Sequence, residues 1–130
     1  MCSIETHFLS YKPMDAILIE SDGHFGMVDS DGTMATGWRE IDGQWYFFNN
    51  SGAMQTSWYD DGSSWYWFGS DGAMATGWRS IAGSWYYFDV SGVMKSNCWM
   101  SDYCFLPDGA MATNTVIDGC RIGPDGRWIP

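Results

Sequence analysis

The sequence predicts an all-β fold, a solenoid of stacked β-hairpins that repeat about every 20 residues. The first observation is a recurring pair of tryptophan positions, Trp38, Trp58 and Trp78 followed by Trp45, Trp65 and Trp85. The second is the aromatic run that begins at the later tryptophan, which reads WYFF, WYWF and WYYF. Aromatic runs favour strands, and no segment combines a helical period with freedom from glycine and turn pairs.

Each good repeat, within about residues 33–92, is predicted to fold as one β-hairpin and a connecting loop. Its first strand follows the alternating pattern Trp-Arg-x-Ile, and its second strand is the aromatic run. Between them lies Asp42-Gly43, Asp61-Gly62 or Ala82-Gly83. Asp-Gly between two short strands is a strong hairpin signal. A second turn, rich in Ser, Asp and Gly, precedes each Gly-x-Met group and links one hairpin to the next.

Weaker copies flank the good repeats on both sides. Upstream, GHFGMVDSDG at 23–32 aligns with GQWYFFNNSG at 43–52, with Phe25 in place of tryptophan. Downstream, residues 93–130 hold the contracted copy YCFLPDGAMAT and a half-length terminal unit. We therefore assign residues 23–130 to the repeat array, and residues 1–22 to a linker or an N-terminal cap.

The hairpins are expected to be stable only when they stack. A lone hairpin is marginal in water, whereas stacked repeats bury a continuous core between neighbours. Nine tryptophans, seven tyrosines and nine methionines supply that apolar mass in a chain of 130 residues. Phe48, Phe68 and Phe88 end each aromatic run, and we expect them to lie in the core.

Charge and composition exclude several classes of function. A net charge of −10 with only six basic residues argues against binding nucleic acid. No stretch approaches a membrane span, and no signal peptide is visible. No catalytic constellation, cofactor motif or metal-ligand spacing is present, so the chain is not expected to be an enzyme.

The cysteines are expected to be free thiols in small apolar positions, as at Cys98, Cys104 and Cys120. A disulfide between Cys98 and Cys104 stays open as an alternative, because sequence alone does not fix connectivity.

The pattern GWRxIxGxWYYFxxxGxMxTGW resembles the choline-binding, or cell-wall-binding, repeat of surface proteins and lysins from Gram-positive bacteria and their phages. The resemblance covers roughly residues 23–130. It implies a left-handed superhelix of hairpins that binds the choline head groups of teichoic or lipoteichoic acids between adjacent repeats. It also implies an extracellular, cell-wall-associated module without catalytic activity, such as the binding tail of a larger cell-wall hydrolase.

The implied ligand explains the aromatic residues. A trimethylammonium group has no N–H to donate, so a protein holds it by attraction to aromatic faces and by burying its methyl groups. By position, the resemblance implies three cages, each with both tryptophans of one hairpin and a tyrosine of the next. The cages are Trp38, Trp45 and Tyr66; Trp58, Trp65 and Tyr86; and Trp78, Trp85 and Tyr103. Methionines are expected to close a fourth, apolar side, namely Met54, Met74 and Met94.

The closing aromatic has a competitor within each repeat. Strand alternation places the residue two positions after the second tryptophan on the same face as that tryptophan. These residues are Phe47, Trp67 and Tyr87. The tyrosine directly after the tryptophan is the preferred choice, because it alone is constant in the three good repeats.

Other functions compete with choline binding. Glucan- or host-glycan-binding repeats of glucosyltransferases and large clostridial toxins share GWxxIxGxxYYF but usually lack the second tryptophan, which this chain has three times. A structural array whose aromatic residues bind nothing is a further alternative. The last hairpin of an array leaves an aromatic face uncovered, so a homodimer through a terminal hairpin is also expected.

Overall fold

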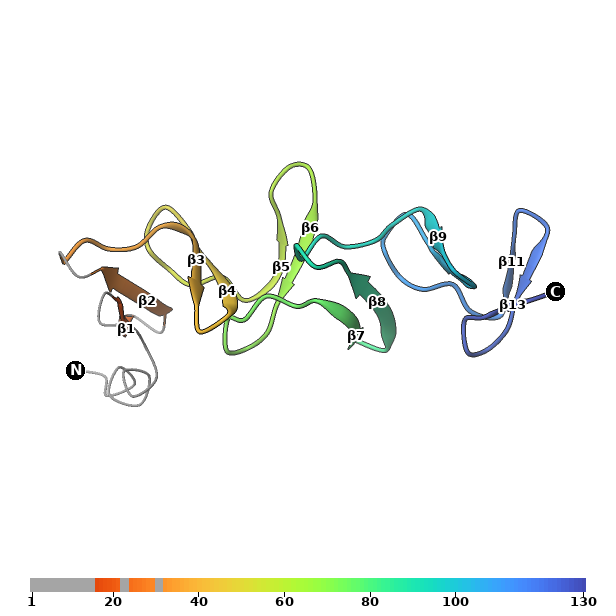
Figure 1. The fold of residues 1–130 in the computed structure, drawn as a ribbon, viewed down its shortest axis with the longest axis horizontal. Coiled ribbons are helices and arrows are strands. Elements are labelled where there is room, and N and C mark those ends of the chain that lie inside the picture. Colours follow the sequence, from red (N-terminus) through yellow and green to blue (C-terminus); the bar gives the residue numbers. More distant parts are fainter. Residues whose placement is uncertain (1–15, 22–23, 30–31) are drawn as a thin grey trace. The chain divides into compact units, whose positions relative to one another are not determined.

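The computed structural model describes residues 16–21, 24–29 and 32–130 (Figure 1). Every regular element in this part of the chain is a β-strand, which confirms the all-β prediction. The described residues fall into two compact units. Unit 1 runs to Tyr59 and includes Trp67–Met74, and unit 2 comprises Asp60–Tyr66 and Ala75–Pro130.

The strands of unit 1 form antiparallel hairpins between consecutive elements. The first pair is β1 (Ala16–Ser21) with β2 (His24–Asp29), and the second is β3 (Gly37–Ile41) with β4 (Gln44–Phe48). The third pair, β5 (Ser57–Asp60) with β6 (Trp65–Phe68), has residues in both units. β1 falls in the segment expected to be a linker or cap, and it pairs with the degenerate repeat. Residues 1–15 of that segment lie outside the described residues.

Unit 2 continues the same construction with shorter strands. The two-stranded sheets are β7 (Gly77–Ile81) with β8 (Ser84–Phe88), and β9 (Cys98–Met100) with β10 (Tyr103–Phe105). The chain ends in a three-stranded sheet of β11 (Thr115–Ile117), β12 (Cys120–Ile122) and β13 (Trp128–Ile129). The contraction foreseen after residue 93 therefore shortens the strands and preserves the hairpin pattern.

The tight turns at the hairpin tips have the backbone that their residues favour. Ile41 pairs with Gln44, which leaves a two-residue loop whose Asp42 and Gly43 have φ of 55° and 80°. Positive φ at both central positions is the type I′ geometry, whose twist matches that of the flanking strands. Ala82 and Gly83 repeat it with φ of 53° and 88°. Two of the three predicted hairpin turns thus have this geometry, including the one without Asp. The third differs, because β5 ends at Asp60 and β6 begins at Trp65, so Asp61 and Gly62 lie in a longer loop in which Gly62 has φ of 96°.

The phenylalanine at the end of each aromatic run forms the core. Phe48, Phe68 and Phe88 are each at most 1% exposed, as predicted. Each forms a β-bridge with the methionine six residues later, and the contracted repeat does the same at Phe105 and Met111. The three described cysteines are free, and Cys104 is buried beside Ala112 and Ile122.

Methionines link successive repeats within each unit. The backbone N–H of Met74 donates to the carbonyl of Trp45 at 2.9 Å, and that of Met111 donates to the carbonyl of Trp85 at 2.8 Å. Methionine side chains also cover the turn glycine of the following repeat. A Cβ added to Gly72 would lie 2.7 Å from Met54 Cε and 3.0 Å from its Cγ. Glycine is required there both for its φ of +85° and for this close approach.

Candidate ligand-binding site

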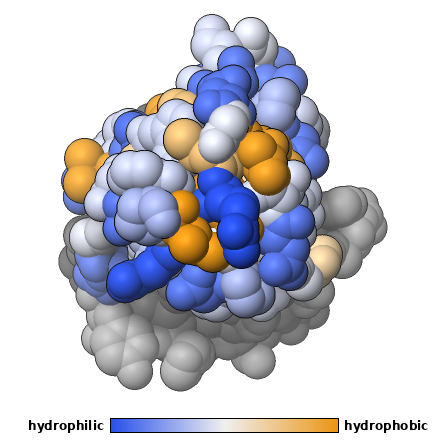
Figure 2. Space-filling model, turned by 90° about the vertical axis from the view of Figure 1, so that its right-hand side faces the viewer, coloured by the Kyte–Doolittle hydropathy of each residue, from blue (hydrophilic) through white to orange (hydrophobic). Residues whose placement is uncertain are grey.

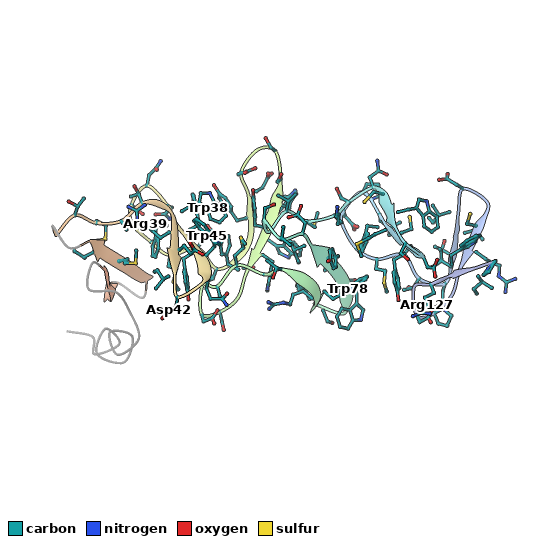
Figure 3. The ribbon with its side chains drawn as sticks, in the orientation of Figure 1. Trp38, Arg39, Asp42, Trp45, Trp78 and Arg127 are labelled. Carbon is teal, nitrogen blue, oxygen red and sulfur yellow. The ribbon has the colours of Figure 1, made fainter. Side chains whose placement is uncertain are left out.

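A cavity of about 370 Å³ in unit 2 is the candidate site. Its lining brings together residues from three successive repeats: Trp78, Trp85, Tyr103, Met111 and Asp125. The first three of these were predicted to form one cage, and they line one space. Figure 3 labels Trp78 on β7 and Arg127 just before β13.

The two tryptophans form a corner because of the hairpin register. Trp78 pairs with Tyr87 and Ser80 pairs with Trp85, so the two indoles are diagonal neighbours on one face of the hairpin. Their ring centroids are 6.3 Å apart and their planes meet at 79°. Trp78 is 38% exposed and Trp85 is 46% exposed, so both indoles keep surface available for a ligand.

Tyr103 adds a third aromatic wall from the next hairpin. Its ring centroid lies 5.1 Å from that of Trp78, with an interplanar angle of 71°. Tyr103 is half-buried, whereas Cys104 and Phe105, which follow it on the strand, are buried. Tyr87, the competing choice to Tyr86 for closing the second cage, packs against Trp78 within its own hairpin at 5.3 Å.

The two remaining lining residues, Met111 and Asp125, were not predicted from the sequence. Met94 was expected to close a side here, but its side chain lies over Gly109 and Met111 lines the cavity instead. A signal for Met111 was available, because it follows Tyr103 by eight residues just as Met94 follows Tyr86. Asp125 had no such signal, since an Asp before a turn glycine is explained by local bonding.

The last segment of the chain holds the outer end of Tyr103. Arg127 Nε donates a hydrogen bond to Tyr103 Oη at 3.2 Å, and the two residues also form a backbone β-bridge. This hydrogen bond, with the nearby charges of Asp125 and Asp102, raises the pKa of Arg127 above its usual range. Asp125 Oδ1 in turn accepts the backbone N–H of Arg127 at 3.0 Å. A carboxylate and a guanidinium therefore stand together beside the cavity.

Unit 1 repeats the tryptophan corner. Trp38 and Trp45 have ring centroids 6.3 Å apart and planes that meet at 74° (Figure 3). Trp38 packs on Phe47 of its own hairpin and on the buried Phe68. Tyr66, the predicted closing residue, falls in unit 2, so this cage stays a prediction.

The middle cage also stays a prediction, because its residues are divided between the units. Trp58 lies in unit 1, where its ring centroid is 5.2 Å from that of Trp67. Trp65 and Tyr86 lie in unit 2, where the Trp65 carbonyl accepts the N–H of Met94 at 2.9 Å. The predicted closing methionines of unit 1 are Met54, which covers Gly72, and Met74, which is buried and forms a β-bridge with Phe68.

The described residues contain no group of three His, Cys, Asp or Glu side chains placed to hold a metal ion. No helix among them has the length and apolar character needed to cross a membrane.

Three family models match consecutive parts of the chain. Two describe choline-binding repeats and match residues 55–99 and 93–128, and the third describes a cell wall binding repeat and matches residues 36–54. Together they span residues 36–128, which lie within the predicted array. No curated protein matches the chain.

Solved structures share the fold. Choline binding protein F from Streptococcus pneumoniae is 36% identical with a TM-score of 0.81, and the match covers 87% of this chain and 40% of that protein. The same protein with a peptidoglycan analogue gives 35% identity, a TM-score of 0.82, and coverage of 87% and 39%. The modular autolysin LytC from Streptococcus pneumoniae is 28% identical with a TM-score of 0.58, with coverage of 87% and 32%. The chain therefore spans less than half the length of these proteins.

An alternansucrase in complex with isomaltononaose is 22% identical with a TM-score of 0.55. The match covers 88% of this chain and 10% of that enzyme, and it shows a common fold alone.

Proposed function

Because this chain belongs to the choline-binding, or cell-wall-binding, repeat family, we propose that it attaches to the cell wall by binding choline head groups of teichoic or lipoteichoic acids. The observation that carries the proposal is the cavity with three aromatic walls and one carboxylate, Trp78, Trp85, Tyr103 and Asp125. Such a module acts at the cell surface by binding and performs no reaction itself.

The chemistry of the cavity suits a quaternary ammonium. Steeply angled aromatic faces surround the methyl groups from several directions, and the quadrupole of each ring attracts the positive charge. Met111 adds a polarisable apolar contact, and Asp125 adds a negative charge. Each aromatic face contributes about 0.5–1 kcal/mol at an exposed site and about 2 kcal/mol when desolvated. One cage is therefore weak, and a polymer carrying many head groups gains affinity by engaging several cages at once.

We extend the proposal to the two cages predicted from the sequence. Trp38 and Trp45 reproduce the corner of the described cavity, with a centroid distance and an interplanar angle close to those of Trp78 and Trp85. The repeat register assigns Tyr66 to this corner, and it assigns Tyr86 to Trp58 and Trp65. By the same register, Met74 and Met94 occupy in these cages the place that Met111 has in the third.

A glycan ligand is the alternative that the test must include. Choline binding protein F has a structure in the presence of a peptidoglycan analogue, and the alternansucrase structure holds an oligosaccharide. The matched family models are those of choline-binding repeats, and the doubled tryptophan favours a cation over a sugar. Choline is therefore the ligand that we propose.

The homodimer through a terminal hairpin stays a prediction. Val116, Trp128 and Ile129 are 59%, 42% and 43% exposed at the C-terminal sheet. Figure 2 shows that the apolar residues at this end are separated by hydrophilic ones rather than joined in one patch.

The test is a thermal melt followed by near-UV circular dichroism, with choline, tetramethylammonium, sodium and dextran compared at equal concentration. We expect the melting temperature and the aromatic signal to shift with choline and tetramethylammonium but not with sodium, because a ligand that binds only the folded state stabilises it. A shift with dextran alone would transfer the function to glycan binding. No shift with any of them would leave the aromatic residues a purely structural role.

The variants Trp85→Ala and Trp99→Ala locate the site. Both side chains lie on strands and are similarly exposed, at 46% and 39%, but only Trp85 lines the cavity. We expect Trp85→Ala to lose the part of the choline shift that comes from this cage, and Trp99→Ala to keep it. Equal choline responses in the two variants would contradict the placement.

A further inference from the structure

A guanidinium stands beside a cavity that we propose binds a cation. Arg127 is exposed, and its Nε is committed to Tyr103 Oη at 3.2 Å, so its positive charge sits at the outer end of one cage wall. Its Nη1 and Nη2 have no hydrogen bond or ion pair to the residues that the structure describes. For a free cation this arrangement is unfavourable, because like charges repel.

The arginine is specific to this cage. In the Gly-x-Met segments and their C-terminal counterpart, the residue after the turn glycine is Thr33, Ala53, Ala73, Val93, Ala110 and finally Arg127. The Gly-x-Met register therefore places a neutral residue at this position in the other two predicted cages. The third cage alone carries a cation there, and this cation is bonded to a cage residue.

The two charged residues beside the cavity, Asp125 and Arg127, occupy different positions relative to it. Asp125 lines the cavity itself, whereas Arg127 contacts the hydroxyl end of Tyr103, away from the ring face that meets Trp78. A ligand that matches this order has its positive charge in the cavity and a negative charge at the rim. Phosphocholine has that order, since a short linker joins its ammonium to a phosphate.

We propose that the third cage binds the whole phosphocholine unit, with the ammonium among Trp78, Trp85 and Tyr103 and the phosphate on Arg127. Arginine suits this role, because its planar set of donors matches the oxygens of a phosphate. The inference rests on the proposed function and deepens it: this cage selects choline that is esterified to phosphate, as in a polymer, over free choline.

The test compares choline with glycerophosphocholine, whose phosphodiester carries the same linkage as a polymer. Isothermal titration is done on the full chain with Trp45→Ala and Trp65→Ala, two half-exposed tryptophans of the other predicted cages. We expect glycerophosphocholine to bind about two- to fivefold more tightly than choline, the range for an exposed ion pair. Added salt should reduce this preference.

Arg127→Gln and Arg121→Gln are the matched variants. Both remove one positive charge from an exposed side chain of the C-terminal unit, but Arg121 lies on β12 and does not line the cavity. We expect Arg127→Gln to abolish the preference for the phosphodiester. It should lower the affinity for choline less than it lowers the affinity for glycerophosphocholine. Arg121→Gln should keep the preference, and Arg127→Lys should keep part of it because it retains the charge.

The outcomes separate the two proposals. Equal affinities for the two ligands, or the same change of their ratio in Arg127→Gln and Arg121→Gln, would overturn the role of Arg127 while choline binding stands. Binding of neither ligand would overturn both proposals. If the tryptophan variants do not fold, the ratio is measured with Arg127→Gln alone in the otherwise unchanged chain, where loss of the phosphodiester preference is again the expected result and an unchanged ratio refutes the role of Arg127.

Discussion

Replacing a turn glycine that lies under a methionine should destabilise the protein more than replacing one that faces solvent. Gly72 has φ of +85°, and an added Cβ would meet Met54 at Cε and Cγ, 2.7 and 3.0 Å away. Gly43 has φ of +80°, and an added Cβ there meets nothing within 4 Å. Gly72→Ala and Gly43→Ala therefore share the backbone strain, and only Gly72→Ala adds a collision.

The structure sets the expected size of the difference. A non-glycine residue with left-handed backbone costs about 1–2 kcal/mol, which applies to both variants. Forcing extra atoms into a packed contact costs about 1–3 kcal/mol more, and the whole thioether of Met54 would have to move. We expect the free energy of unfolding to fall by about 1–2 kcal/mol in Gly43→Ala and by about 2–5 kcal/mol in Gly72→Ala. The effect of alanine on the unfolded chain is common to both and cancels in the comparison.

The assay is urea unfolding followed by tryptophan fluorescence, with Met54→Ala and the double variant completing a double-mutant cycle. In the double variant the shortened Met54 side chain leaves room for the new Cβ. The loss of unfolding free energy in the double variant should therefore be smaller than the sum of the losses in the two single variants. Equal losses of unfolding free energy in Gly72→Ala and Gly43→Ala, or full additivity in the cycle, would refute the idea that the close contact between a methionine and the next turn glycine stabilises the packing of successive repeats.

Two further predictions concern the hairpin turns. Ala82 has φ of 53° in a type I′ turn, a position that asparagine tolerates better; Ala82→Asn should stabilise the protein by about 0.5–1 kcal/mol and raise the melting temperature by roughly 2–4 °C, and an unchanged melting temperature would contradict the strain. Hydrogen bonds from the N–H groups of Ser63 and Ser64 lower the pKa of Asp61. Its contribution to stability is therefore full above the usual carboxyl pKa of about 4 and is lost as pH falls through the lower folded value. When thermal melts are measured between about pH 7 and pH 3, the melting temperature of Asp61→Asn should fall less steeply below about pH 4 than that of the unchanged protein. Identical pH profiles of the two proteins would show that Asp61 does not contribute to the loss of stability in acid.

Local sequence determined the hairpins, because each depends on residues close together in the chain. Asp42-Gly43 specifies its turn through backbone preference, and the aromatic run favours a strand. Phe48 and Phe68 end such runs and were expected in the core, and both are buried. Nothing distant is needed for these features, so the aromatic runs and the turn pairs indicated the all-β class.

The sequence by itself thus determined the family, the repeat, the hairpins and the three aromatic residues that line the described cavity. Only the tertiary structure decided which methionine and which charges surround that cavity. Met111 follows Met94 by 17 residues rather than 20, and its place depends on how the contracted hairpin stacks on the one before it. Asp125 lines the same cavity as Tyr103, and Arg127 is bonded to Tyr103, although they lie 22 and 24 residues further along the chain. Contacts of this kind arise from packing between repeats, and no local propensity encodes them.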